Sequence, residues 1–185
     1  MNSRSCLLSS IFFALLPFAA SAQDWSGAYG AVMFSNGGGD VRAPSTFDLD
    51  GQAYGIAVGY NVQSGNFVYG GELAYQKSEI DLVHPAPFKQ RYESLLDLKG
   101  RFGYSSGPFL AYGVIGYSVN KYALTGATSD GGGFSYGLGA DYKINDRMFV
   151  GAEYLMRDMH NDAVSGINAL DANLSTVSLR FGMSF

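Results

Sequence analysis

The stretch Asn173-Leu174-Ser175-Thr176-Val177-Ser178-Leu179-Arg180-Phe181-Gly182-Met183-Ser184-Phe185 decides the fold. Side chains alternate between the two faces of a β-strand, so every second residue shares a face. One face then carries an unbroken apolar row: Val177, Leu179, Phe181, Met183 and Phe185. The other carries Ser178, Arg180, Gly182 and Ser184. This pattern is typical of a transmembrane β-strand with lipid on one side and a narrow polar lumen on the other.

The first 22 residues have the three parts of a secretory signal peptide. Arg4 is the positive charge, Leu7–Phe18 is the apolar core, and Ala20-Ser21-Ala22 is a small-residue cleavage site. The apolar core is shorter than the roughly 20 residues that a spanning helix needs. We therefore expect a cleaved signal at 1–22 and one domain at 23–185. The only cysteine, Cys6, would leave with the signal, so no disulfide is expected in the mature chain.

Composition restricts the possible functions. Without Arg4 the chain has 11 basic and 16 acidic residues, a net charge of −5. Such a chain has no basic stripe to neutralise phosphates, so we expect no nucleic-acid partner. The 25 Gly, 13 Tyr and 13 Phe suit a small barrel with aromatic girdles.

Eight segments show period-two alternation, each close to the roughly 9–11 residues that a tilted strand needs to cross the hydrocarbon. In one of them Tyr54, Ile56, Val58, Tyr60 and Val62 alternate with small residues. The sequence therefore predicts an all-β fold, an eight-stranded antiparallel up-and-down transmembrane β-barrel. The segments are 24–34, 52–62, 67–78, 93–104, 109–121, 133–143, 148–158 and 173–185.

A secreted lipocalin-like barrel would show the same alternation with its large residues turned inward. Two observations favour the membrane. The small-residue face carries only about nine charges, too few for a solvated exterior but suited to the interior of an eight-stranded barrel. The connections also alternate in length, as in outer-membrane barrels. Short ones fall at 63–66, 105–108 and 144–147, and long ones at 35–51, 79–92, 122–132 and 159–172.

Two further expectations follow from these connections. The runs Gly37–Gly39 and Gly131–Gly133 lie in long connections or at their edge and are expected to be flexible loop segments. Aromatic residues near the strand ends at the short-turn side are expected at the membrane interface. They are Trp25, Tyr60, Phe67, Tyr104, Phe109, Tyr142, Phe149 and Phe185.

The segment Asp24-Trp25-Ser26-Gly27-Ala28-Tyr29-Gly30-Ala31 resembles the first strand of the outer-membrane β-barrel domain family, which includes OmpA/OmpX-like and small porin-like surface proteins. Gly151-Ala152-Glu153-Tyr154 and the final Phe185 add to the resemblance. It implies a place in the outer membrane of a Gram-negative bacterium, in contact with outer-membrane lipid and lipopolysaccharide. It also implies that Phe185 is an assembly signal for the barrel-assembly machinery.

Nine charged residues are expected to face the lumen, and most should pair because an eight-stranded barrel is filled by side chains. We expect Arg180 to pair with Glu153 on the neighbouring strand, which favours a plugged barrel. The alternative is a narrow ion or solute path lined by Arg101, Arg157 and Arg180. The nine are Glu72, Asp97, Lys99, Arg101, Asp141, Lys143, Glu153, Arg157 and Arg180.

Candidates for catalysis and metal binding are weak. His160 faintly resembles the histidine of lipid A deacylases, but Asp162 stands where their nucleophilic serine would be, and His84 has no adjacent serine. Asp48 and Asp50 share a spacing with Asp158, His160 and Asp162, without a fixed ligand cage. We expect no enzyme, cofactor or metal site. The first hypothesis is a structural barrel whose four outward loops contact host or envelope ligands. A small-solute channel and a lipid A-modifying enzyme are the alternatives.

Overall fold

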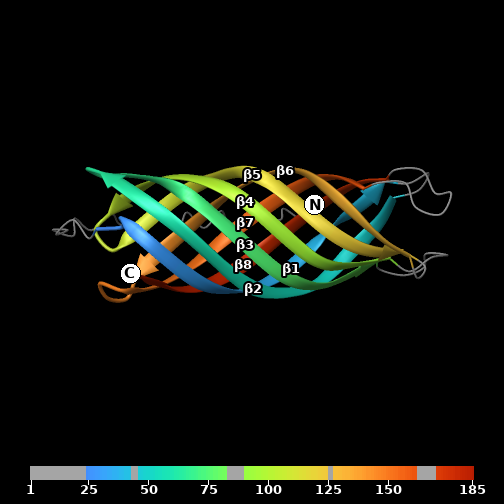
Figure 1. Ribbon diagram of the computed structural model, residues 1–185, viewed down its shortest axis with the longest axis horizontal. Coiled ribbons are helices and arrows are strands. Elements are labelled where there is room, and N and C mark those ends of the chain that lie inside the picture. The colour runs from blue at the N-terminus through green and yellow to red at the C-terminus, as the bar shows by residue number, and fades with distance from the viewer. Residues whose placement is uncertain (1–23, 43–45, 83–89, 125–126, 162–169) are drawn as a thin grey trace, which may run out of the picture.

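The computed structural model describes residues 24–42, 46–82, 90–124, 127–161 and 170–185, so the expected signal peptide at 1–22 lies outside the described residues. Figure 1 shows a long barrel of tilted strands. Within the described ranges no helix is long and apolar enough to cross a bilayer. The strands are β1 (Gly27–Arg42), β2 (Thr46–Ser64), β3 (Phe67–Leu82), β4 (Gln90–Ser106), β5 (Phe109–Leu124), β6 (Ala127–Lys143), β7 (Met148–Asn161) and β8 (Leu170–Ser184).

The eight strands form one closed antiparallel sheet in sequence order, which confirms the predicted fold class. β1 closes the barrel because Gly30 lies opposite Val58 of β2 on one side and Met183 of β8 on the other. Closure matters in lipid, since an open strand edge would leave backbone groups without hydrogen bonds.

Three short turns gather at one end of the barrel, here called the turn end, where β1 begins and β8 ends (Figure 1). They lie at the three positions expected from the sequence. Gly65 and Gly107 have φ angles of 61° and 58°. Residues with a side chain rarely adopt this left-handed conformation, so glycine is required for these tight turns. The opposite end is called the far end.

The expected long connections are wrong in length, because the strands run further than the hydrocarbon requires. They have 14 to 19 residues, against the roughly 9–11 needed to cross. Gly37–Gly39 belongs to β1 and Gly131–Gly133 to β6, so neither run is a flexible loop. At Gly39 a Cβ atom would lie 2.0 Å from the carbonyl oxygen of Asn173. At Gly133 the distance to the Asp158 carbonyl oxygen would be 1.7 Å, so at Gly39 and Gly133 glycine allows the close approach of a neighbouring strand.

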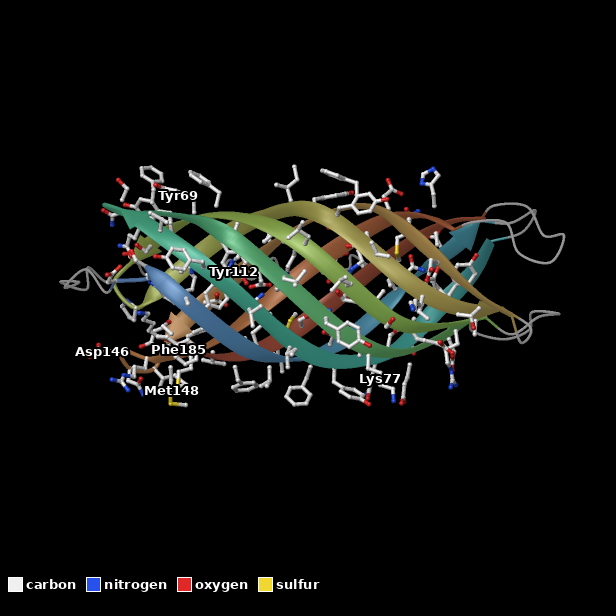
Figure 2. The ribbon with its side chains drawn as sticks, in the orientation of Figure 1. Tyr69, Lys77, Tyr112, Asp146, Met148 and Phe185 are labelled. Carbon is white, nitrogen blue, oxygen red and sulfur yellow. The ribbon has the colours of Figure 1, made fainter. Side chains whose placement is uncertain are left out.

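The outer surface has two zones (Figure 2). From the turn end to beyond the middle, the outward side chains form an apolar band in which Leu98 and Leu138 are 64% and 70% exposed. Towards the far end the outward residues of the same strands become charged or polar. We call this charged zone the collar. Its described charges are Asp40, Asp48, Asp50, Lys77, Glu79, Asp81, Arg91, Glu93, Lys121, Asp130 and Asp158.

Two of the eight expected interface aromatics are placed wrongly. Trp25 and Phe149 lie inside the barrel and are each 3% exposed, with their ring centroids 6.2 Å apart. Each lies four residues from an inward-facing side chain, Trp25 from Tyr29 and Phe149 from Glu153, and therefore falls on the same face of the extended chain. The other six are exposed on the outer surface, as expected.

Candidate functional site: the charged lumen

The lumen is filled in three successive layers. Along β7 the large inward residues are Phe149, then Glu153 and Arg157 with Leu155 between them, then Met159. The turn-end layer is therefore aromatic, the middle layer is ionic, and the layer at the far end is apolar. All nine charged residues expected in the lumen are buried, each at most 5% exposed.

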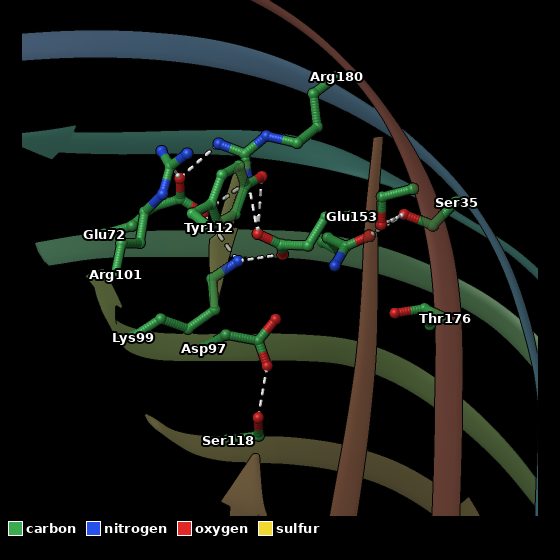
Figure 3. Close-up of polar contacts among 12 residues, drawn as sticks. Ser35, Glu72, Asp97, Lys99, Arg101, Tyr112, Ser118, Glu153, Thr176 and Arg180 are labelled. Atoms are coloured by element: carbon green, nitrogen blue, oxygen red, sulfur yellow. Dashed lines mark hydrogen bonds and ion pairs between the residues drawn. The ribbon is translucent and has the colours of Figure 1, made fainter. Parts of the chain in front are cut away.

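The ionic layer centres on Glu72 of β3 and Arg180 of β8, which face each other across the barrel (Figure 3). Arg180 Nη1 donates to Glu72 Oε1 at 3.0 Å and to Glu153 Oε2 at 2.9 Å. The second contact is the Arg180–Glu153 pair expected from the sequence. One guanidinium thus joins two acids from different walls, in the multidentate geometry that favours arginine over lysine.

Two bases of β4 complete the central group. Lys99 Nζ lies 2.7 Å from Glu72 Oε1 and also pairs with Glu153 of β7. Arg101 lies 2.6 Å from Asp141 of β6 and 3.2 Å from Glu72. Ion pairs therefore span the lumen from β4 to β7 and from β3 to β8, and they join acids and bases of opposite walls directly.

Two tyrosines belong to this group and were missed by sequence reasoning. The Tyr29 hydroxyl donates to Glu72 at 2.7 Å and accepts from Arg101 at 2.5 Å. The guanidinium of Arg101 lies 3.9 Å from the ring centroid of Tyr112, a cation–π contact. The inward parity of Tyr29 and Tyr112 could have identified them, but an aromatic residue in such a strand is expected first at the membrane interface.

A second ionic group lies closer to the far end. Arg157 of β7 forms a two-pronged pair with Asp97 of β4, at 2.8 Å from Nε and 2.7 Å from Nη2. Ser118 donates to Asp97 at 2.6 Å, and Arg157 donates to Thr176 at 2.9 Å. Together the two groups contain four acids and four bases. This balance is what buried charges require, since an unpaired charge in a low-dielectric interior is strongly destabilising.

Lys143 is the ninth expected residue and stands apart from both groups. Its ammonium lies 5.1 Å from the ring centroid of Trp25 and donates to the backbone carbonyl of Asp24 at the turn end. Hydrogen bonds from the backbone and hydroxyl of Ser26 hold the pKa of the Asp24 carboxyl below its usual value. Lys143 therefore binds the residues that precede β1 and holds them across the opening of the lumen at the turn end.

The far-end layer is an apolar core of eight buried residues from six strands. Tyr92 and Tyr122 pack with ring centroids 6.2 Å apart, next to residues such as Ile80 and Leu95 that are fully buried. Its outer wall is the charged collar. Polarity therefore inverts along the barrel: apolar outside and ionic inside in the band, then charged outside and apolar inside at the far end. The core residues are Leu49, Ile80, Tyr92, Leu95, Tyr122, Met159, Ala172 and Leu174.

Comparison with known proteins identifies the family. Residues 5–185 match the outer membrane protein beta-barrel domain family. The chain belongs to this family. It is 28% identical over 175 residues to a 22 kDa outer membrane protein of Rhizobium leguminosarum bv. viciae, covering 89% of this chain and 80% of that protein. This family member is therefore an outer-membrane β-barrel protein of the Gram-negative type.

Solved structures show the same fold. Ail, the attachment invasion locus protein of Yersinia pestis, was solved with the heparin analogue sucrose octasulfate. It has a TM-score of 0.56 and 13% identity over 86% of this chain and 99% of its own. Neisserial surface protein A has a TM-score of 0.56 and 14% identity over 86% and 98%. OprG of Pseudomonas aeruginosa has a TM-score of 0.54 and 15% identity over 86% and 96%. At these identities the likeness concerns the fold.

The remaining candidates of this outer-membrane barrel lie on its outer surface or outside the described residues. His160 is exposed on β7, and Asp48 and Asp50 are exposed on β2. His84 and Asp162 lie outside the described residues. Among the described residues, the structure brings together no group of three His, Cys, Asp or Glu side chains suited to a metal ion. The lumen is therefore the site with the most developed chemistry.

Proposed function

We propose that this protein is a non-conducting outer-membrane barrel that displays a rigid acidic collar at the cell surface. The observation that carries the proposal is the set of ion pairs that cross the lumen, Arg180 to Glu72 and Lys99 to Glu153. An ion would have to separate these pairs and then pass an apolar core in which Ile80 and Leu95 are fully buried. Both steps are costly, because separating a buried ion pair leaves uncompensated charge and moving an ion into an apolar core removes its water.

The alternative of an ion path lined by Arg101, Arg157 and Arg180 has less support. Each of these guanidinium groups contacts a carboxylate, at 2.6, 2.7 and 2.9 Å respectively. Barrels that conduct well have about 16 strands, whereas an eight-stranded interior is just wide enough to be filled by side chains.

In this proposal the turn end faces the periplasm, the usual position of short turns in outer-membrane barrels. The collar then stands outside the cell, and Phe185 lies at the periplasmic end, where the assembly machinery would recognise it. The described collar carries eight acids and three bases. The net negative charge of the collar suits basic patches on a host or envelope partner. A polyanion, such as the heparin analogue bound to Ail, would need a basic surface instead.

Planar-bilayer recording tests the sealed lumen. We expect no stable single-channel steps from the refolded protein, with insertion verified by flotation with vesicles and by heat-dependent gel migration. A Tyr92→Ala, Leu95→Ala variant thins the far-end core but keeps the ionic layer, so it should also stay silent. Stable steps from the unmodified protein would overturn the proposal in favour of the channel.

A further inference from the structure

A groove of about 840 Å³ crosses β8, β1 and β2 on the outer surface, where the apolar band meets the collar. Its floor is the backbone of β1 at Gly37 and Gly38. Tyr54 and Gln52 of β2 line one wall, and Val177 and Leu179 of β8 line the other. We propose that this groove binds one lipid A glycolipid of the outer leaflet, with an acyl chain in its lower half and a glucosamine in its upper half.

The groove changes from apolar to polar at the same level on two neighbouring strands. Phe34 lies opposite Tyr54 and Leu179 in the ladders. Two residues further towards the far end, Asn36 lies opposite Gln52. A lipid lying along β1 would meet the same change from hydrocarbon to headgroup. The groove is therefore matched in depth to the interface of a leaflet, where amphipathic groups prefer to lie.

Gly38 keeps the groove open. Its missing side chain faces outward, and a Cβ atom there would meet the Leu49 carbonyl oxygen only at 3.6 Å, an ordinary contact. Sterically, a larger residue would fit, and it would fill the groove. The groove wall is also braced, because the Ser175 hydroxyl donates to the Gly38 carbonyl at 3.0 Å. The hollow is thus part of the rigid strand framework.

The upper half of the groove offers hydrogen bonding with little charge. Asn36 and Gln52 present amides, and Asp50 presents a carboxylate that continues the β2 wall. Within the described residues none of these three side chains has a hydrogen-bond or ion-pair partner. Free amide and carboxylate groups at this depth suit the hydroxyls and amides of an acylated sugar, each of which both donates and accepts.

The chemistry separates a sugar from other headgroups. No Lys or Arg is among the described residues that line the groove, and Asp50 would repel a phosphate, so a phosphate should point away from the groove. An ammonium headgroup would depend on Asp50, whereas a sugar could use Asn36 and Gln52 and would tolerate an amide at position 50. Lipid binding in this groove does not depend on whether the lumen is sealed. It rests only on the part of the proposed function that places the collar outside the cell.

Native mass spectrometry of the barrel in phosphatidylcholine nanodiscs doped with lipid A tests the proposal. We expect one lipid A retained per barrel. Gly38→Phe should reduce retention about tenfold or more by filling the groove, and Asn36→Ala with Gln52→Ala should reduce it about tenfold through the loss of two hydrogen bonds. Asp50→Asn should retain lipid A.

The matched control is Gly100→Phe. Gly100 also faces outward, and a Cβ atom added there would lie 3.7 Å from its nearest neighbour, but this glycine lies in the band on another strand. The variant should retain lipid A like the unmodified barrel. The proposal fails if Gly38→Phe and the double alanine variant both retain lipid A. It also fails if phosphatidylethanolamine is retained equally well and Asp50→Asn abolishes retention. Neither result bears on conductance, so the two proposals can fail separately.

Discussion

Replacing Arg180 by methionine tests whether the ionic layer is one interdependent network. Arg180 is completely buried and contacts both Glu72 and Glu153. Its removal leaves four buried acids with three bases. Breaking a buried ion pair by deleting one partner costs about 3–5 kcal/mol, because the remaining charge is left uncompensated. With a urea m-value of about 2 kcal/mol/M, the unfolding midpoint should fall by about 2 M.

The assay is urea unfolding in lipid vesicles, followed by the fluorescence of the single tryptophan, Trp25, which packs against Phe149 in the lumen. Arg147→Met is the matched control, since this arginine is exposed in a turn and its loss should change stability by less than about 0.5 kcal/mol.

A second substitution separates charge balance from packing. Arg180→Met combined with Glu153→Gln returns the layer to three acids and three bases, while Lys99 keeps Glu72 at 2.7 Å. The double variant should be more stable than Arg180→Met alone, with a coupling energy of about 0.5–3 kcal/mol. If Arg180→Met unfolds within about 1 kcal/mol of the unmodified barrel, or the double variant is no more stable than the single one, the network interpretation is refuted.

Three further predictions concern the apolar band, the far-end core and the collar. Leu138→Arg places a charge in the apolar band and should lower the stability in vesicles by about 2–4 kcal/mol. Thr128→Arg, on the same face of β6 near the far end, should be nearly neutral; equal effects would contradict the boundary between band and collar. Ile80→Ala opens a cavity in the far-end core and should cost about 2–5 kcal/mol by the same urea assay. The purified barrel should pass through a heparin column unretained at physiological salt, and retention would show that the acidic collar does not determine what its surface binds.

The strand count, the closure and the lumen charges could be predicted from sequence because each follows from parity. In β8 the neighbouring residues Phe181 and Arg180 point to opposite faces of the sheet, Phe181 outward and Arg180 inward. The same alternation places Glu72 and Glu153 inside. The pairing partners could not be predicted, apart from Arg180 with Glu153. Contacts such as Asp97 with Arg157 cross the lumen from β4 to β7, and their reach depends on barrel diameter and strand stagger, which no local pattern specifies.

The sequence predicts loops at the far end because the faces of its strands are reversed there, with charged residues outward and apolar residues inward. Leu49 lies between Asp48 and Asp50, and Met159 lies between Asp158 and His160. These segments alternate as strictly as the band, but with the apolar residue inward, as in a strand facing water. A search for apolar residues facing outward therefore finds no strand there. Alternation of either polarity would have predicted the longer strands.

The irregularity in β4 shows how one strand can pass from the apolar band, which faces lipid, to the charged collar, which faces water. Leu95 and Asp97 face inward, so in an uninterrupted strand Glu93 and Arg91 would also face inward, and Tyr92 would face water. The register instead shifts between Tyr92 and Ser94, leaving Glu93 outside the ladder. A bulge of this kind changes the phase of alternation. It turns Tyr92 into the far-end core against Tyr122 and puts Arg91 outside, 2.7 Å from Asp81. Because a one-residue slip would reverse the faces, the bulge is needed for the collar and the core to coexist on β4.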